Sequence, residues 1–240
     1  MTVVTADEDP DPYRPAARWP AHLRGVTETV VTTLGPNDRW NVAALGIEVG
    51  PEDAVTSGPA DAASDGDASL DDLGGDSGGE ASGQSPAPPP VTARTWGRTR
   101  TRRNFEARGE GYVQFTTDPV DFVEAALSVR EADKPVLESA AAWVRVSVER
   151  VDAGRADGTE WVEWDLHPIE SVVRQVDVPT INRGYNALVE ATVVASRLDV
   201  AAYEDQPLED RLEYLRGVVA RCGGPREQAA LDRLESLRGP

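Results

Sequence analysis

Residues Val91 to Phe105 read VTARTWGRTRTRRNF. β-Branched and aromatic residues come first, which is typical of a strand, and Gly97 then marks a turn. Hydroxyl, guanidinium and amide side chains follow where a helix is expected to begin. The first N–H groups of a helix have no partner inside it and carry the positive end of its dipole. The stretch therefore predicts a strand, a turn and a helix N-terminus that binds an anion such as phosphate.

Five arginines crowd within ten positions of this stretch: Arg94, Arg98, Arg100, Arg102 and Arg103. The whole chain has 42 acidic against 24 basic residues and a formal net charge of -18, so a local cationic cluster indicates an anionic ligand. Two alternatives stay open. In the first, the cluster is only a solvated helix face with local salt bridges among Arg102, Arg103 and Glu106. Alternatively, the arginines with Trp96 and Phe105 would contact a nucleic acid, which the net charge disfavours.

The composition narrows the class of protein. A uniform acidic excess with a single lysine, Lys134, is typical of a cytosolic protein from a salt-accumulating halophile. The single Cys222 excludes an intrachain disulfide and a cysteine metal site, and His22 and His167 are too far apart for a typical metal-ligand motif. Because no basic leader or long apolar run is present, we expect a cytoplasmic protein without a membrane partner. No residue pattern identifies a catalytic residue.

Two composition shifts precede the central stretch. Residues 1–22 are acidic and rich in proline, which predicts a disordered tail. Residues 25–33 and 40–49 are strand-like, and the Gly-Pro-Asn-Asp turn between them predicts a hairpin. Residues 50–90 contain nine acidic residues, no basic residue and no aromatic residue, so we expect a disordered insertion. Such an insertion leaves the flanking strands free to be neighbours, because the entropy of loop closure grows slowly with length.

After the central stretch the pattern alternates between helix and strand and then becomes helical. Gly109 ends the predicted helix 101–108, and Pro119 begins another. Strands are expected at 111–117, 143–151 and 159–166, with a turn at 152–158 and an extension toward residue 179. Beyond Asn182, which is a good helix cap, apolar residues recur at helical spacing. These patterns predict a mainly β protein with α-helices, with about six strands over residues 23–178 and a helical segment over 179–240.

Four of these segments together resemble an archaeal family of unknown physiological function. They are GVTETVVTT with WNVAALGIEV, the TRTRRNF element, GYVQFTTDP with its helix, and INRGYNALVEATVVASRL. The sequence is similar to domain-of-unknown-function family 447, whose members are FMN-binding split β-barrel proteins related to flavoredoxin and to pyridoxamine-phosphate-oxidase-like flavoproteins. The resemblance implies a six-stranded split (Greek-key) barrel with a C-terminal helical segment. It also implies a homodimer with FMN near the subunit interface.

The resemblance assigns site residues as well. It implies that Thr99, Arg100, Thr101 and Asn104 hold the FMN phosphate, since hydroxyl donors and a guanidinium suit a dianion. Thr and Asn near a helix start are also common caps, so the Thr-x-x-Asn pattern alone is not specific.

The edge of the second strand, with Asn41, Ala43 and Ala44, is implied to lie along the isoalloxazine ring; related proteins often have proline where this chain has Ala44. Asn182, Arg183 and Gly184 either complete the site or cap the helix that follows. We expect the helix cap.

The resemblance implies an FMN-binding flavoprotein, in particular a flavin reductase-like oxidoreductase with a nicotinamide electron donor. The missing Ser/His/Asp set or metal cluster does not count against this, because a flavin carries its own redox chemistry. The alternative is a non-catalytic protein that holds FMN or serves as a scaffold.

Overall fold

The structure is a computed structural model that describes residues 18–50, 90–156, 158–176, 178, 180–200 and 202–238. The predicted tail at 1–22 and insertion at 50–90 lie largely outside these residues. The described strands are β1 (Val26–Leu34), β2 (Trp40–Val49), β3 (Val91–Trp96), β4 (Glu110–Thr116), β5 (Arg130–Ala132), β6 (Ala140–Ala156) and β7 (Thr159–Val173). The described helices are α1 (Arg100–Arg108), α2 (Pro119–Leu127), α3 (Arg183–Ala195), α4 (Asp205–Cys222) and α5 (Pro225–Arg238).

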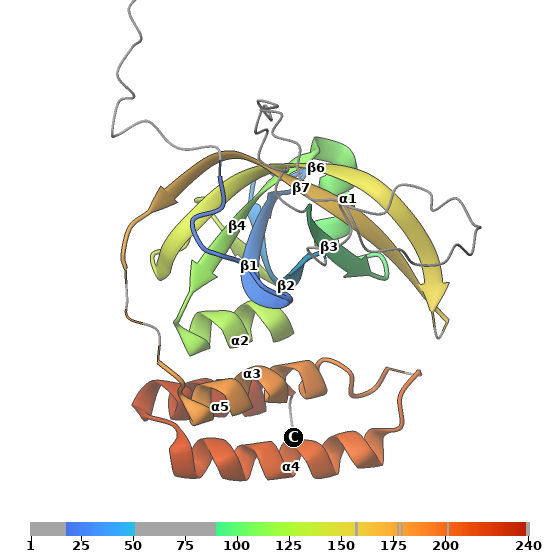
Figure 1. Cartoon of the computed structure of the whole chain (residues 1–240). Helices are drawn as coiled ribbons and strands as arrows, with labels where there is room; N and C mark the ends of the chain where they lie inside the picture. The colour runs from blue at the N-terminus through green and yellow to red at the C-terminus, as the bar shows by residue number, and fades with distance from the viewer. Residues whose placement is uncertain are drawn as a thin grey trace, which may run out of the picture.

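Six antiparallel strands form a closed barrel. Their order is β1-β4-β6-β7-β3-β2, and the pairing of β1 with β2 closes the ring (Figure 1). This confirms the mainly β fold with a six-stranded barrel. The short β5 pairs with β2 outside the ring and was not predicted, since three residues carry too little alternation to show a strand.

The hairpin of β1 and β2 forms as expected. The two strands pair in one continuous register from Val26 with Glu48 to Leu34 with Trp40. In the turn between them, Gly35 N donates a backbone hydrogen bond of 2.8 Å to Arg39 O. β-Branched residues on both strands favour this extended pairing.

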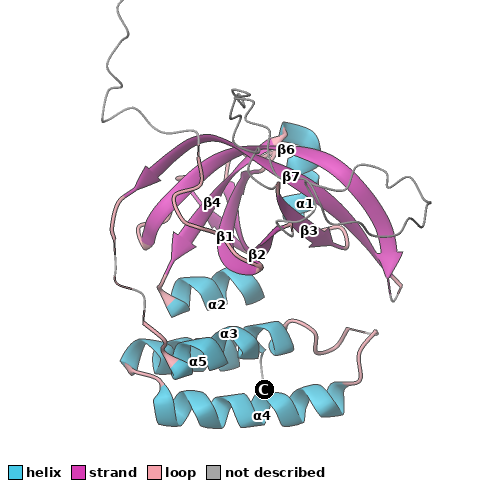
Figure 2. Cartoon of the chain, in the orientation of Figure 1, coloured by secondary structure: helices cyan, strands magenta, loops and turns pink. Residues whose placement is uncertain are grey.

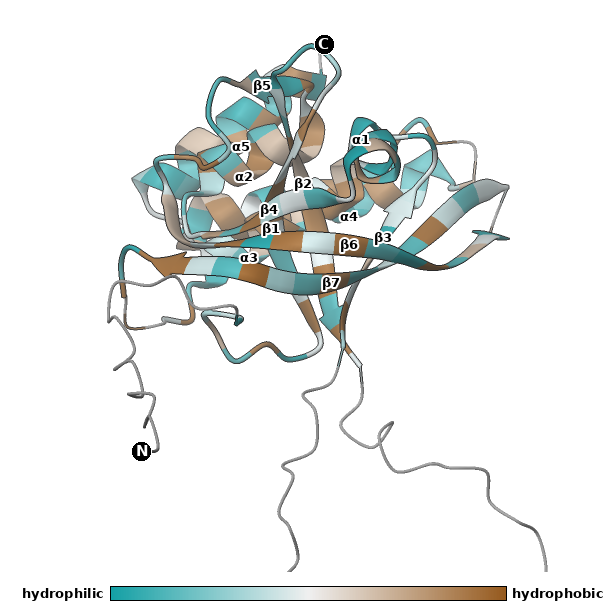
Figure 3. Cartoon of the chain, turned by 90° about the horizontal axis from the view of Figure 1, so that it is seen from above, coloured by the Kyte–Doolittle hydropathy of each residue, from teal (hydrophilic) through white to brown (hydrophobic). Residues whose placement is uncertain are grey.

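The hairpin of β6 and β7 corrects one prediction. A turn over residues 152–158 is wrong, because the two strands stay paired from Asp152 with Glu163 to Ala156 with Thr159. Gly158, with φ of 80°, lies in the tight turn. Apolar and polar residues follow one another along the barrel part of both strands (Figure 3). Beyond Val148 the residues of β6 are exposed or half-buried, so the buried-strand signal is absent there.

One fully buried side chain of the barrel core comes from a helix rather than from the sheet. Phe105 of α1 is 1% exposed and packs edge-to-face on Trp164, with ring centroids 5.4 Å apart. The helix begins at a Thr99 cap and ends at Gly109, which has a positive φ of 66°. Helix α1 therefore covers one end of the barrel, while the other four helices lie together on one side (Figure 2).

Helix α2 connects the barrel to the C-terminal helices. Its Phe122 and Ala125 join a buried cluster with β1 and β2, whereas its Val123 joins the core of α3, α4 and α5. An ion pair between Arg233 and Glu124, at 3.0 Å, also links α5 to α2. None of the described helices combines the length and the apolar character that a membrane crossing needs.

Candidate functional site

The central stretch folds as its sequence predicts. Strand β3 pairs with β7 from Thr92 to Trp96, and the chain then turns at Gly97, whose φ is 67°. The Thr99 hydroxyl accepts a hydrogen bond from Arg102 N at 3.2 Å, so Thr99 is the N-cap of α1. The amides of Arg100 and Thr101 have no hydrogen-bond partner among the described residues. Two donors at the positive end of the helix dipole are therefore free for an anion.

The barrel is split beside this helix start. Strand β2 pairs with β3 only through Ile47–Val49, and with β5 only through Trp40–Val42. Between these two regions, residues Ala43–Gly46 pair with β1 alone in the described part of the chain. No described strand lies beside their other backbone edge. Such an edge offers N–H and C=O groups to a ligand, because backbone polar groups need hydrogen-bond partners.

A cavity of about 900 Å³ lies at this split. Six of the predicted site residues line it: Asn41, Ala43, Ala44, Thr99, Arg100 and Thr101. The volume falls within the range of roughly 300–1,000 Å³ that is usual for small-molecule sites. The structure thus brings the β2 edge and the α1 start, which are almost sixty residues apart in sequence, to one cavity.

One buried hydrogen bond joins the two halves of the site. Asn41 Nδ2 of β2 donates to Thr101 Oγ1 of α1 over 3.3 Å, and both side chains are buried. The bond fixes the Thr101 hydroxyl as an acceptor toward Asn41, so its own proton is available to a ligand in the cavity.

Asn104, the seventh predicted site residue, does not line this cavity. Its Nδ2 donates to the Thr33 hydroxyl at 2.9 Å and to the Thr33 carbonyl at 3.3 Å. It therefore ties α1 to β1, and it lines a second cavity that lies farther along the helix. Its assignment to the phosphate remains a prediction.

Sequence reasoning did not identify the contribution of the helical layer. Phe122 and Ala125 of α2, and Thr192, Ser196 and Arg197 at the C-terminal end of α3, also line the cavity. A threonine and a serine among the apolar residues that recur along α3 could have indicated this contribution. From the helical spacing alone, that face of α3 was expected only to pack against other elements. Asn182 and Gly184 lie outside this lining: Asn182 caps α3 by accepting from Tyr185 N at 3.1 Å, as expected.

The clustered arginines divide into paired and unpaired side chains. Arg94 forms an ion pair with Glu163 and stacks on Trp161, with its guanidinium 4.3 Å from the ring centroid. Arg100 pairs with Glu131 at 2.8 Å. The salt-bridged helix face is present at Arg102, which lies 3.0 Å from Glu106. Arg98 and Arg103 have no ion pair among the described residues.

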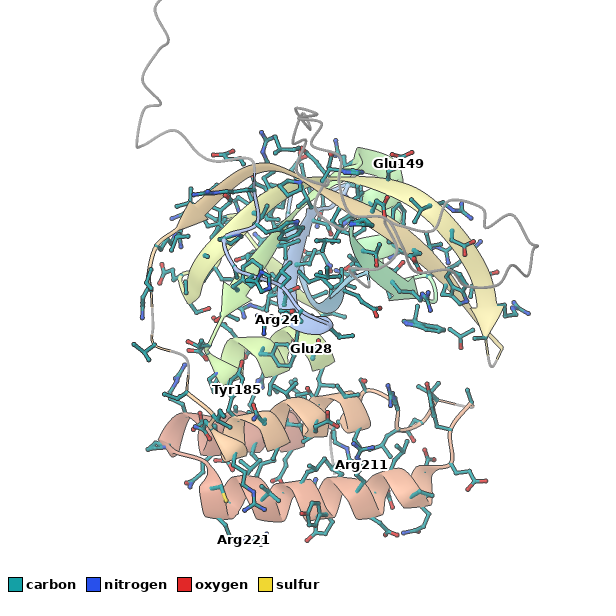
Figure 4. The ribbon with its side chains drawn as sticks, in the orientation of Figure 1. Arg24, Glu28, Glu149, Tyr185, Arg211 and Arg221 are labelled. Atoms are coloured by element: carbon teal, nitrogen blue, oxygen red, sulfur yellow. The ribbon has the colours of Figure 1, made fainter. Side chains whose placement is uncertain are left out.

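Glu28 is a titratable group on the cavity lining with a shifted pKa. It lies on β1 opposite Gly46, on the side that faces α3 (Figure 4). Burial raises the pKa of this carboxyl, and the negative charge of Glu190 raises it further. Glu28 therefore keeps a proton at a higher pH than an ordinary glutamate. Within the described residues, no group of three or more His, Cys, Asp or Glu side chains is placed to hold a metal ion.

These features define a class of protein. A six-stranded antiparallel barrel is split along one strand pair, and a ligand-sized cavity at the split meets a helix N-terminus. This is the arrangement of a split-barrel ligand-binding protein.

Two family models match the chain. An N-terminal model described as "Protein of unknown function (DUF447) N-terminal domain" matches residues 85–175, and the C-terminal model of the same family matches residues 182–236. Together they cover more than half of the chain. The protein belongs to the DUF447 family.

Solved structures are similar to this chain to different degrees. An FMN-bound DUF447 protein from Methanosarcina mazei is 19% identical, with a TM-score of 0.64 over 90% of this chain and 96% of that one. The nitrilotriacetate monooxygenase component B from Bacillus cereus is 10% identical, with a TM-score of 0.38 over 63% and 70% of the two chains. The styrene monooxygenase flavin reductase from Pseudomonas putida is 11% identical, with a TM-score of 0.37 over 65% and 93%. The comparison with curated proteins gave no match.

Proposed function

We propose that this protein is an FMN-binding flavoprotein. The observation that carries the proposal is the cavity at the barrel split, where the open edge of β2 and the N-terminus of α1 meet. The family relative from Methanosarcina mazei is an FMN-bound protein with the same fold. The residues present in this chain also suit the two chemically different ends of FMN.

The α1 end of the cavity suits the phosphate. The amides of Arg100 and Thr101 and the Thr101 hydroxyl are hydrogen-bond donors at the positive end of a helix dipole. The Arg100 guanidinium adds a positive charge, which its ion pair with Glu131 partly offsets. In our proposal Thr99 contributes by capping the helix, which holds these amides in place.

The β2 end of the cavity suits the flat ring. Ala43, Ala44 and Gly46 have small side chains or none, so a planar group can approach the strand closely. The unpaired backbone edge of Ala43–Gly46 offers hydrogen bonds in the plane of such a ring. Phe122 and Ala125 supply an apolar wall from α2, which excludes water.

The finer proposal is a flavin reductase-like oxidoreductase that takes electrons from a nicotinamide donor. When bound, the flavin supplies the electron-transfer chemistry, and the protein binds, orients and shields it. Glu28, whose pKa is raised by burial and by the charge of Glu190, is a titratable group on the same cavity lining. Steady-state oxidation of NADH and NADPH with FMN and an electron acceptor tests this. Absence of turnover with either donor favours a non-catalytic FMN-holding protein.

The proposal includes a homodimer. The segment between β7 and α3 exposes three large apolar side chains, Val176, Val178 and Ile181, which are 87%, 88% and 95% exposed. Exposed apolar side chains close together in sequence favour contact with another protein surface. Light scattering coupled to size-exclusion chromatography, run in KCl, tests for a mass of two chains. A mass of one chain at all concentrations contradicts the dimer.

An FMN titration tests the site directly. We expect about one flavin per chain, and Thr101→Val to weaken FMN binding about tenfold or more by removing a donor to the phosphate. Riboflavin, which lacks the phosphate, should lose less affinity than FMN in the variant; what it does lose reports the broken hydrogen bond from Asn41. The matched control is Thr116→Val on β4, outside the cavity, which loses the 3.2 Å hydrogen bond to Ser139 O and the 3.0 Å bond from Asp118 N. Equal FMN affinity of wild type and Thr101→Val would show that the phosphate lies elsewhere.

A further inference from the structure

A second cavity lies farther along α1 than the first. Its volume is about 650 Å³, and it is lined by the turn between β1 and β2, by α1 and by Glu131 of β5. Five residues of α1 line it: Arg100, Arg103, Asn104, Ala107 and Arg108. Their spacing of three, one, three and one residues places them on one helix face, which extends over about 12 Å.

This cavity is cationic in a strongly acidic chain. Three guanidiniums line it, and Glu131 is the one acid among the described lining residues. The Glu131 carboxylate is already held by Arg100 at 2.8 Å and by Asn37 Nδ2 at 3.2 Å. Arg103 and Arg108 have no ion pair with a described residue. With a formal net charge of -18, carboxylates are abundant, so two unpaired guanidiniums in one cavity indicate an anionic ligand.

The rest of the lining suits a ligand that has an organic body beside its anionic groups. Leu34, Pro36 and Ala107 provide apolar surface, and Asn37 offers amide groups for hydrogen bonds. Arg103 and Arg108 are about 7.5 Å apart along the helix axis, so they suit phosphate groups at two separate positions on one molecule. An adenine nucleotide with two separated phosphates has this chemistry.

The second cavity adjoins the first. Both are lined by Asn41 and Arg100, so the two cavities share a wall at the start of α1. A ligand of dinucleotide size in the second cavity can therefore reach the site that we propose for the flavin.

We propose that the second cavity binds the adenylate half of NADPH, with Arg103 and Arg108 holding its phosphates. The assignment to an electron donor rests on the proposed flavin site, whereas the nucleotide site stands on its own lining. In this proposal the second cavity selects NADPH over NADH, because the 2′-phosphate of NADPH supplies the second anionic group for the two arginines.

The test uses 2′,5′-ADP, a fragment of NADPH that carries the 2′-phosphate and lacks the nicotinamide. Its binding to the full chain is measured by calorimetry at the lowest KCl concentration at which circular dichroism shows a folded protein. We expect saturable binding, tighter than that of AMP or inorganic phosphate. The double variant Arg103→Gln/Arg108→Gln should bind 2′,5′-ADP about tenfold more weakly or worse, since charge-assisted hydrogen bonds are lost.

The matched control is Arg98→Gln/Arg150→Gln, which removes two positive charges from positions outside both cavities. It should keep wild-type affinity. The site is refuted if 2′,5′-ADP does not bind saturably, if the control loses as much affinity as the double variant, or if AMP or inorganic phosphate binds equally well.

FMN titration of the same proteins separates the two proposals. Because Arg103 and Arg108 do not line the first cavity, the double variant should retain FMN. If the double variant loses 2′,5′-ADP binding but still binds FMN, the effect is confined to the second cavity. If the wild type binds 2′,5′-ADP but does not bind FMN, the flavin site is refuted and the nucleotide site is not.

Discussion

Replacing Asn104 with alanine should destabilise the fold rather than weaken FMN binding. Asn104 is 7% exposed, and its amide donates to both the hydroxyl and the carbonyl of Thr33, which is fully buried. Each lost hydrogen bond costs roughly 1 kcal/mol, and a buried hydroxyl left without its donor raises the total further. The better helix propensity of alanine returns about 0.5 kcal/mol. The expected net loss in the free energy of unfolding is about 2–3 kcal/mol.

Thermal denaturation of the apo-protein at fixed KCl measures this loss. A change of about 2–3 kcal/mol in a protein of this size lowers Tm by roughly 4–12 °C. Arg103→Ala, an exposed neighbour on the same helix, is the control and should change stability by less than about 0.5 kcal/mol. FMN affinity of the folded Asn104→Ala variant should equal that of wild type. An unchanged Tm combined with a large loss of FMN affinity would refute the structural role and restore Asn104 to the phosphate site.

Two further predictions concern the helical layer and its contact with the barrel. Gly184→Ala should unfold the C-terminal helices at a lower denaturant concentration, because a Cβ there would lie 2.4 Å from the backbone of Gly223. In Gly217→Ala, the new Cβ would lie 3.1 Å from the flexible Arg221 side chain, so this substitution should instead stabilise α4 by up to about 1 kcal/mol. Equal effects of the two substitutions on urea unfolding would contradict this packing. Burial acts to raise the pKa of Asp121, but hydrogen bonds from Ser139 and Arg130, with the positive charges of Arg130 and Arg226, together lower it below its ordinary 3.8. Because the pKa is lower in the folded protein, the Asp121 carboxylate stabilises the fold above pH 3.8, and this stabilisation is lost as the pH falls through the folded pKa. Asp121→Asn should therefore flatten the dependence of Tm on pH in that acid range. An unchanged dependence would show that Asp121 does not contribute.

The sequence by itself determined the local elements and part of the site. Residues Val91–Phe105 specify a strand, a Gly97 turn and a Thr99-capped helix through short-range preferences, so these features follow without tertiary contacts. The β1–β2 hairpin and the Asn182 cap are local in the same sense. A distinctive combination of such segments was also enough to indicate the family.

Only the tertiary structure decided which of these residues share a cavity. The sequence grouped Asn104 with Thr101 because they are three residues apart, yet Thr101 faces the barrel split and Asn104 faces Thr33 and the second cavity. The α2 and α3 residues on the first cavity, and the Arg103–Arg108 face, depend on how helices pack against the barrel. Helical spacing shows which residues lie on one face, but the surface that this face meets is set by long-range packing, which no local pattern encodes.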